Sequence, residues 1–272
     1  MARLAAAWKK SGQSLALVPT MGALHEGHAT LLRRARKENR RVVLSVFVNP
    51  TQFGPKEDFS RYPRTLASDA RLAAACGVDA IYAPSAPVLY PEGFSTFVSV
   101  RGLSDLLCGA FRPGHFAGVA TVVLKLLETV RPARAYFGEK DFQQLVIVTR
   151  MAADLGLPVK IVPCPTVRES DGLALSSRNR YLSPAERARA PGIRAALEWA
   201  AAEARRPGRT AAGLEAGARK RIARIPGSRI DYVRLVDPAT LRAPVRLRGR
   251  LRLLAAVRIG RTRLIDNVDI LC

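Results

Sequence analysis

The chain has few cysteines, few aromatic residues and no long hydrophobic run. Its four cysteines, Cys76, Cys108, Cys164 and Cys272, are scattered and form no CxxC pair, whereas a zinc site or a disulfide framework needs closer or more numerous partners. We therefore expect free thiols in a reducing compartment. No apolar run approaches the roughly 20 residues that span a bilayer, and the first residues lack the apolar core of a secretory signal. We expect a cytoplasmic protein that does not contact membranes.

Charge of one sign is abundant instead. The 272 residues carry a formal net charge of +22, with 44 Lys and Arg against 22 Asp and Glu. Such a charge is typical of proteins that bind nucleic acid or acidic membranes. However, basic segments such as residues 219–224 and 242–252 contain no aromatic residues, although single-strand-binding surfaces place aromatic side chains among the basic ones. We expect a solvated arginine-rich surface rather than a nucleic-acid partner, and keep a polyanion partner as the alternative.

The first part of the chain alternates short apolar runs with helical patterns. The runs typical of buried strands lie at residues 15–19, 42–48, 80–84 and 159–163. The stretches with apolar residues at helical spacing lie at residues 27–39, 63–76, 117–130 and 141–155. This alternation predicts an α/β fold, a Rossmann-like parallel sheet with helices on both faces. In such a sheet, ligands bind beyond the carboxyl ends of the strands.

The second part of the chain has a different order of elements. Helical patterns come first, at residues 184–203 and 210–223, and strand-like runs follow at 230–236, 250–257 and 264–268. Helices followed by strands predict a separate, smaller α+β domain. We place the boundary after the proline-rich stretch at residues 163–165, which gives domains at 1–165 and 166–272.

The first motif, PTMGALHEGH at residues 19–28, follows the first predicted strand and opens a helix. A helix N-terminus attracts phosphate through its free N–H groups and its partial positive charge. Gly27 allows a ligand to approach the backbone closely. His25 and His28 can donate hydrogen bonds to phosphate oxygens as charge develops there. The alternatives are capping or surface histidines, or a metal-binding pair completed by His115, the third histidine.

Two further motifs carry polar groups suited to a small acid. FVNPTQF, at residues 47–53, leaves the second strand, and its Asn49 and Gln52 amides can bind a hydroxyl and a carboxylate. Phe47 can cover methyl groups of the same ligand. RPGHFAGV, at residues 112–119, leads into a helix, where Arg112 and His115 can face an anion. A simple turn is the alternative for both.

The last two motifs suit a nucleotide. In FGEKDFQQ, at residues 137–144, Gly138 permits close approach, Lys140 suits phosphate and Asp141 can accept from a ribose hydroxyl. Gln144 lies one helical turn beyond Lys140. In LSSRNR, at residues 175–180, two hydroxyls and an arginine can bind a triphosphate. The alternatives are a solvated run of charges and a basic loop between domains.

These motifs together resemble one family. The His-x-Gly-His element is similar to the signature of nucleotidylyltransferases and class I aminoacyl-tRNA synthetases. The longer string PTMGALHEGH, with the RPGHF, GEKDFQQ and LSSRN elements, resembles the pantothenate synthetase family from about residue 15 to the end. Leu175 stands where many members have methionine. The resemblance implies ATP-dependent condensation of (R)-pantoate with β-alanine to pantothenate, through a pantoyl-adenylate, with release of AMP and pyrophosphate. It places the protein in coenzyme A biosynthesis.

The resemblance also implies roles for individual residues. It implies that His28, His25, Lys140 and Arg178 are catalytic. The implied ATP-binding residues are Met21, Gly22, Ala23, Leu24, His25, Glu26, Gly27, His28, Gly138, Glu139, Lys140, Asp141, Val167, Leu175, Ser176, Ser177 and Arg178. The implied pantoate- and β-alanine-binding residues are Gln52, Gln144, Asn49, Phe47, Arg112 and His115. Mg²⁺ is implied to enter with ATP, with Asp69 as a weak candidate ligand.

The resemblance further implies a homodimer, with ATP and pantoate bound by the first domain and a lid formed by the second. Three alternatives stay open at this point. Another nucleotidylyltransferase would share the first motif but not the paired glutamines. A basic nucleic-acid-binding protein with a degenerate enzyme fold would show salt-dependent binding and no ATP consumption. A regulatory metabolite sensor is the third.

Overall fold

The structure is a computed structural model that describes residues 1–55 and 57–272. The chain forms two compact units. The N-terminal unit comprises Met1–Asp105, Arg112–Glu139 and Gln144–Pro165. The C-terminal unit comprises Thr166–Cys272 together with two short segments, Leu106–Phe111 and Lys140–Gln143. Among the described residues, no helix combines the length and the apolar character that crossing a membrane requires.

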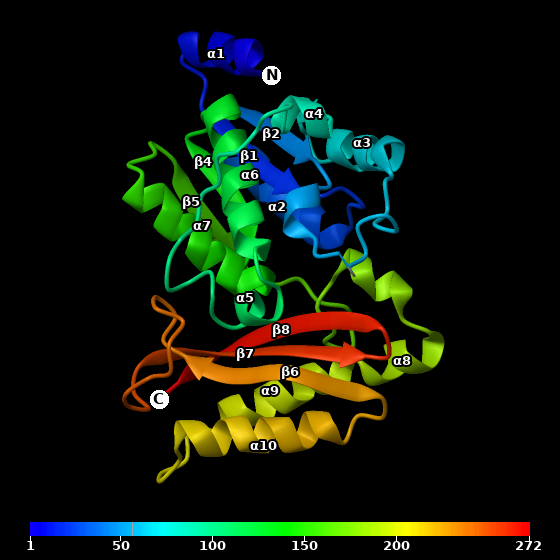
Figure 1. Cartoon of the computed structure of the whole chain (residues 1–272), viewed down its shortest axis with the longest axis vertical. Coiled ribbons are helices and arrows are strands. Elements are labelled where there is room, and N and C mark those ends of the chain that lie inside the picture. Colours follow the sequence, from blue (N-terminus) through cyan, green and yellow to red (C-terminus); the bar gives the residue numbers. More distant parts are fainter. Residues whose placement is uncertain (56) are drawn as a thin grey trace. The chain divides into compact units, whose positions relative to one another are not determined.

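The N-terminal unit is built on a five-stranded parallel sheet in the order β3-β2-β1-β4-β5 (Figure 1). Its strands are β1 (Leu15–Thr20), β2 (Arg41–Val46), β3 (Ala80–Tyr82), β4 (Arg134–Gly138) and β5 (Lys160–Cys164). This is the strand order of a Rossmann-like sheet, in which the chain reverses its direction of growth between β1 and β4. The loops that follow β1 and β4 therefore lie beside the position where such sheets bind ligands.

Helices cover this sheet because their apolar residues recur at helical spacing. The helices of this unit are α1 (Ala2–Lys10), α2 (Glu26–Glu38), α3 (Leu66–Ala75), α4 (Ala86–Leu89), α6 (His115–Val130) and most of α7 (Phe142–Asp154). On one face, Leu31, Leu32 and Ala35 of α2 pack with Val18 and Leu44 of the sheet. α6 contacts β1 and α1 in turn contacts α6. The predicted α/β fold class is thereby confirmed.

The short helices α1, α4 and α5 (Cys108–Phe111) were not predicted, and two further differences have a clear local cause. β4 was missed, because its apolar run is only three residues long, between Arg134 and Gly138. The single helix predicted at residues 184–203 is instead two helices, α8 (Pro184–Arg189) and α9 (Pro191–Glu203). Pro191 has no N–H to donate and is well tolerated at the first position of a new helix, so the break occurs before it.

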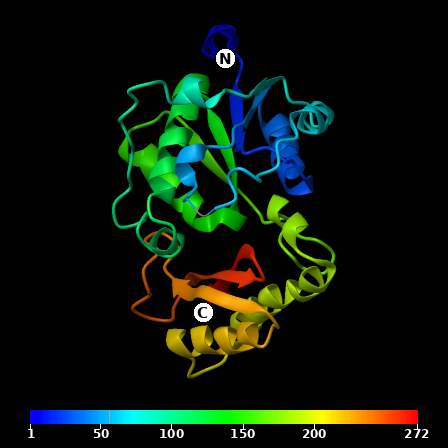
Figure 2. The same cartoon turned by 45° about the vertical axis from the view of Figure 1, so that its right-hand side comes forward.

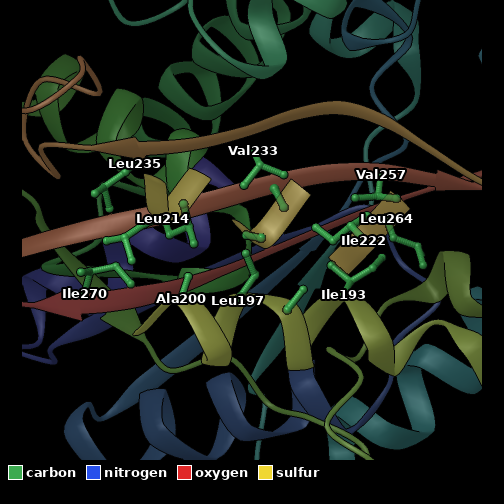
Figure 3. Packing of buried hydrophobic residues seen from close by; sticks show 14 of the residues in the cluster. Ile193, Leu197, Ala200, Leu214, Ile222, Val233, Leu235, Val257, Leu264 and Ile270 are labelled. Carbon is green, nitrogen blue, oxygen red and sulfur yellow. The ribbon is translucent and has the colours of Figure 1, made fainter. Parts of the chain in front are cut away.

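The C-terminal unit is a three-stranded antiparallel sheet in the order β6-β7-β8, with helices on one face (Figures 1 and 2). Its elements are α5 (Cys108–Phe111), α8, α9, α10 (Ala211–Ala223), β6 (Ser228–Val236), β7 (Arg250–Ile259) and β8 (Thr262–Leu271). Ile193 and Leu197 of α9 and Leu214 of α10 pack against Val233 and Val257 of the sheet (Figure 3). The predicted smaller α+β part is also confirmed.

The other face of this sheet carries buried charged and amide side chains. Arg252 of β7 is 4% exposed, and it donates to Asn267 Oδ1 at 2.8 Å and to Asp269 Oδ1 at 2.6 Å. Its guanidinium also lies 4.5 Å from the ring centre of Phe142. On the same face, Arg263 pairs with Asp231 at 2.7 Å. The segments Leu106–Phe111 and Lys140–Gln143 belong to this unit through such contacts, a grouping for which the sequence gives no sign.

Candidate active site

The loop after β1 makes a tight left-handed turn before α2. Gly22 has a φ of 79° and Ala23 a φ of 50°, conformations that glycine adopts easily and alanine rarely. The buried carboxylate of Asp69, on α3, accepts from the N–H groups of Ala23 and Leu24 at 3.1 and 2.8 Å. The turn delivers His25 to the N-cap of α2, so the first motif sits at a helix N-terminus, as predicted from its residues.

The two histidines of this motif lie side by side. Their ring centres are 4.1 Å apart, and the backbone N–H of His25 donates to Nδ1 of His28 at 3.3 Å. Because Nδ1 of His28 accepts, the proton of the neutral ring resides on Nε2. The backbone therefore selects the tautomer in which His28 Nε2 is a hydrogen-bond donor.

The loop after β2 holds two amides in a defined order. The Asn49 side chain is 1% exposed; its Nδ2 donates to Gln52 Oε1 and to Gly118 O, each at 3.1 Å. Its Oδ1 accepts from Thr51 and from Tyr90, at 3.0 and 2.8 Å. These four bonds match the full capacity of an amide side chain. Because Asn49 donates to Gln52 Oε1, it fixes the orientation of the Gln52 amide, and the Gln52 NH₂ group points away from Asn49.

The first and second motifs meet at Gln52. Its Nε2 lies 3.1 Å from Met21 Sδ in the loop after β1. The chain also brings α6 against this loop, because a Cβ on Gly118 would lie 2.4 Å from the backbone oxygen of Thr51. Only glycine permits that approach. The structure therefore brings together the histidine motif, the amide motif and the start of α6.

Arg112 and His115 complete this group through the backbone of Gln52. Arg112 forms a two-point pair with Glu57, with both bonds at 2.6 Å. His115 Nδ1 and Arg112 Nη2 both lie within hydrogen-bond distance of Gln52 O, at 2.8 and 3.2 Å. His115 Nε2 faces Arg112 Nη1 at 2.9 Å. Since a guanidinium only donates, Nε2 accepts and Nδ1 carries the proton.

Two groups beside Gln52 have shifted pKa values. Burial by itself raises the pKa of Glu57, but the hydrogen bonds and charge of Arg112 outweigh it, so the pKa lies below its usual value. Burial raises the pKa of Tyr90 against the opposing hydrogen bonds with Thr51 and Asn49. Glu57 is therefore a carboxylate and Tyr90 a phenol at neutral pH, which suits the bonds that each makes.

The predicted nucleotide motif after β4 divides between the two units. Gly138 ends β4, and η2 (Glu139–Asp141) follows it. Lys140 Nζ lies 3.5 Å from Asp141 Oδ2, and Lys140 O accepts from Asn267 at 3.0 Å. The neighbouring glutamines differ: Gln143 is 4% exposed and bonds the backbone of Cys108 and Leu106. Gln144, the predicted ligand, is half-buried.

The predicted ATP-binding residues after residue 165 lie within the C-terminal unit. Leu175 N donates to Val167 O at 3.0 Å, which brings these two ATP-binding candidates together. Ser176 caps η3 (Ser177–Tyr181), its hydroxyl accepting from Arg178 N at 3.3 Å. The loop between Val167 and Leu175 is anchored by Arg168, which forms two bonds of 2.8 Å to Asp266.

Several residues of this arrangement were not predicted from the sequence. Glu57 and Tyr90 support the loop after β2, and Arg168 and Asp266 anchor the loop between Val167 and Leu175. The partners in these pairs are separated by 55, 41 and 98 residues, so no local pattern links them. Asp69 was predicted only as a weak metal ligand, and its bonds to the loop after β1 likewise join residues 45 and 46 positions apart.

Comparison with known proteins decides the family. The family model described as pantoate-beta-alanine ligase matches residues 1–269. A pantothenate synthetase of Moorella thermoacetica is 52% identical over 263 residues, which is 97% of this chain and 93% of the relative. A pantothenate synthetase structure from Thermus thermophilus superimposes with a TM-score of 0.93 at 48% identity and covers 98% of both chains.

The chain belongs to the pantoate–β-alanine ligase family. The predicted family and the predicted function, an ATP-using ligase of pantothenate biosynthesis, are confirmed, against the alternatives of a nucleic-acid-binding protein and a metabolite sensor. The pantoate–β-alanine ligase of Francisella tularensis, 34% identical with a TM-score of 0.79, covers 98% of this chain and 95% of its own. Its crystal structure is a complex with beta-gamma ATP and β-alanine.

Proposed function

We propose that this ligase activates pantoate as an acyl-adenylate before the amine attacks. A carboxylate is a poor acceptor for an amine, and adenylation provides a leaving group. The pantoate carboxylate attacks the α-phosphorus of ATP and pyrophosphate departs. The β-alanine amine then attacks the pantoyl-adenylate, forming the amide bond of pantothenate and releasing AMP. The protein contributes mainly positioning and charge stabilisation.

The observation that carries this proposal is the geometry of His28. Its Nδ1 accepts from the His25 backbone, which makes Nε2 a donor at a helix N-terminus, where phosphate binds readily. His28, with His25 beside it, stabilises the oxygens of the α-phosphate as charge develops. The turn at 21–24 and the residues Glu26 and Gly27 complete this part of the proposed ATP site.

For pantoate, the proposed ligands are Gln52 and Gln144. Asn49 turns the NH₂ group of Gln52 away from itself, so Gln52 is prepared to donate to an acid. Phe47 is 7% exposed and offers an apolar surface for methyl groups. Arg112 and His115 hold the Gln52 backbone, and we assign them to the pantoate and β-alanine site.

For the departing pyrophosphate, the proposed groups are Lys140 and Arg178, with the hydroxyls of Ser176 and Ser177. Gly138, Glu139 and Asp141 serve the adenosine, as do Val167 and Leu175, which are hydrogen-bonded to each other. We assign ATP and pantoate binding to a domain at 1–165 and a lid function to a domain at 166–272.

Mg²⁺ fits this site as an ion that arrives with ATP. Within the described ranges 1–55 and 57–272, no three His, Cys, Asp or Glu side chains form a cluster that could hold a metal ion. Mg²⁺ does not require such a cluster, because it retains waters and is bound largely through substrate phosphates. The bound ion would neutralise phosphate charge. Asp69 already accepts three hydrogen bonds, which leaves it little capacity as a ligand.

We further propose a cytoplasmic homodimer.

The test is AMP formation from ATP and Mg²⁺, with (R)-pantoate and β-alanine added singly and together. We expect AMP with both substrates only, alongside an equal amount of pantothenate. A product that retains the nucleotide would instead indicate a nucleotidylyltransferase. Replacement of His28 by alanine should lower kcat by about 10²–10³-fold, the usual cost of one charge-stabilising donor. Full turnover in that variant would refute the role of His28.

A further inference from the structure

Asp69 is a buried carboxylate whose hydrogen bonds are directed at a single turn. It lies on α3, is 1% exposed and belongs to the N-terminal unit. Its Oδ2 accepts from the N–H of Ala23 at 3.1 Å. Its Oδ1 accepts from the N–H of Leu24 at 2.8 Å and from the Thr65 hydroxyl at 3.2 Å. A buried carboxylate with so many partners is well satisfied.

The turn that Asp69 holds is an unusual one. Gly22 and Ala23 both have positive φ values, 79° and 50°, and an alanine stays in that region only where its surroundings enforce it. Consecutive N–H groups in such turns converge on an anion. Here the anion is the protein's own carboxylate. A Cβ on Gly22 would lie 3.0 Å from Asp69 Oδ2 and 3.0 Å from Val46, so an added side chain would crowd the carboxylate as well as strain the positive φ.

The same turn sets the position of His28. Leu24 N is bonded to Asp69, and the next N–H along the chain, that of His25, is the donor to His28 Nδ1. A shift of the Leu24 peptide therefore moves the group that fixes the His28 tautomer and ring orientation. The N–H groups of Ala23 and Leu24 are occupied by Asp69, so they are not the groups offered to phosphate in this arrangement.

We propose that Asp69 is a positioning residue that fixes the His25–His28 pair by bonding the Ala23 and Leu24 backbone. This inference rests on the proposed role of His28 in adenylation. It is an alternative to the prediction that Asp69 binds Mg²⁺. Only a metal-binding role predicts that excess Mg²⁺ restores the rate of a variant.

The test compares Asp69→Asn with a matched lesion elsewhere in the same unit. The amide introduced by Asp69→Asn would retain one acceptor oxygen and place an NH₂ donor against a backbone N–H. Asp79→Asn is the control, because Asp79 also uses both oxygens, accepting from Arg36 at 2.9 Å, Arg41 at 2.7 Å and Val42 N at 2.8 Å. None of those partners belongs to the loop after β1.

We expect Asp69→Asn to lower kcat by about 10- to 100-fold, since a displacement of about 1 Å costs that much in positioned catalysis. The KM for pantoate and the Mg²⁺ concentration for half-maximal rate should stay within about twofold of the wild type. Asp79→Asn should lower the Tm about as much as Asp69→Asn does, while its kcat stays within about twofold of the wild type. Circular dichroism at the assay temperature confirms that both variants are folded.

A second variant keeps the proposal testable if Asp69→Asn is unstable. Gly22→Ala disturbs the same turn while retaining the carboxylate, and we expect the double variant to lose no more kcat than the worse single one. The proposal is overturned if Asp69→Asn has normal kcat, if excess Mg²⁺ restores its rate, or if the two losses multiply. Wild-type AMP formation with both substrates, measured in parallel, shows whether the proposed function itself stands.

Discussion

The two sheets of this molecule use buried polar side chains differently. In the parallel sheet of the N-terminal unit, the buried strand residues are mostly apolar, and polar groups such as Asn49 and Asp69 bond to the loops after β1 and β2. In the antiparallel sheet of the C-terminal unit, polar groups lie on the strands themselves, where Arg252 and Arg263 meet acidic partners. Buried polarity therefore positions the proposed active-site loops in one unit and stabilises a sheet face in the other.

Three arginines of the C-terminal unit have a structural role that their sequence did not indicate. The sequence alone offered no catalytic reason for a net charge of +22. In the C-terminal unit, Arg168, Arg252 and Arg263 are largely buried and pair with carboxylates. Long apolar stems with charged heads let arginine cover a sheet face while satisfying acidic neighbours. These three arginines are structural, and because carboxylates compensate their charges they do not explain the net charge of the chain.

The largest expected effect comes from breaking the polar face of the C-terminal sheet. Asp231 is paired with Arg263 at 2.7 Å and Arg258 at 3.7 Å, and its side chain is 8% exposed. Asp231→Ala should lower the free energy of unfolding by about 3–5 kcal/mol, because it leaves buried positive charge without its carboxylate. Urea denaturation measures this.

The matched control is Glu198→Ala, which removes a 57% exposed partner of Arg194 and should change stability by less than about 0.5 kcal/mol. Because this sheet face stabilises the fold and does not carry the proposed chemistry, the folded fraction of Asp231→Ala should retain near-normal kcat. If Asp231→Ala instead had normal stability and lost its turnover, this sheet face would have a catalytic role and the contrast between the two sheets would be wrong.

An intermediate effect on stability is expected from the apolar cores, because both units bury leucine side chains completely. Leu32 on α2 and Leu197 on α9 are both 0% exposed. Replacing either with alanine should cost about 2–5 kcal/mol through lost burial and the cavity left behind. Denaturant titration of the two variants checks this. A cost below about 1 kcal/mol for only one of them would show that its core tolerates collapse and that the units differ in packing as well.

The smallest expected effect is a pH dependence of the stability that Glu57 provides. Arg112 holds the pKa of Glu57 below its usual value of 4.5. A depressed folded pKa stabilises the protein at pH above 4.5, and the gain is lost as pH falls through the folded value. The difference in Tm between wild type and Glu57→Gln should therefore be full at pH 7 and shrink below about pH 4.5.

Glu57→Gln should also raise the KM for pantoate more than it lowers kcat, because Glu57 supports the Gln52 loop through Arg112. A Tm difference that does not vary with pH would contradict the ionised pair. An unchanged KM would remove Glu57 from the loop-positioning group and sharpen the contrast with Asp69.

Local sequence patterns predicted much of the fold and the position of the histidine motif within it. Continuous apolar runs such as residues 15–19 became central strands, and the histidine motif fell at a helix N-terminus. Pattern failed where a signal was short or distant. β4 has only three apolar residues between its ends, and Pro191 divides what helical spacing joined. The roles of Asp69 and Glu57 depend on partners about 45 to 55 residues away, which only the folded chain brings together.

In the proposed reaction, pantoate is adenylated before β-alanine is needed. The direct measurement is a single-turnover reaction of enzyme, ATP, Mg²⁺ and (R)-pantoate without β-alanine, with pyrophosphate and AMP followed separately. We predict about one pyrophosphate per active site, with little AMP until β-alanine is added and rapid AMP release afterwards. Pyrophosphate that appears only after β-alanine is added would contradict the acyl-adenylate and the role we assign to His28.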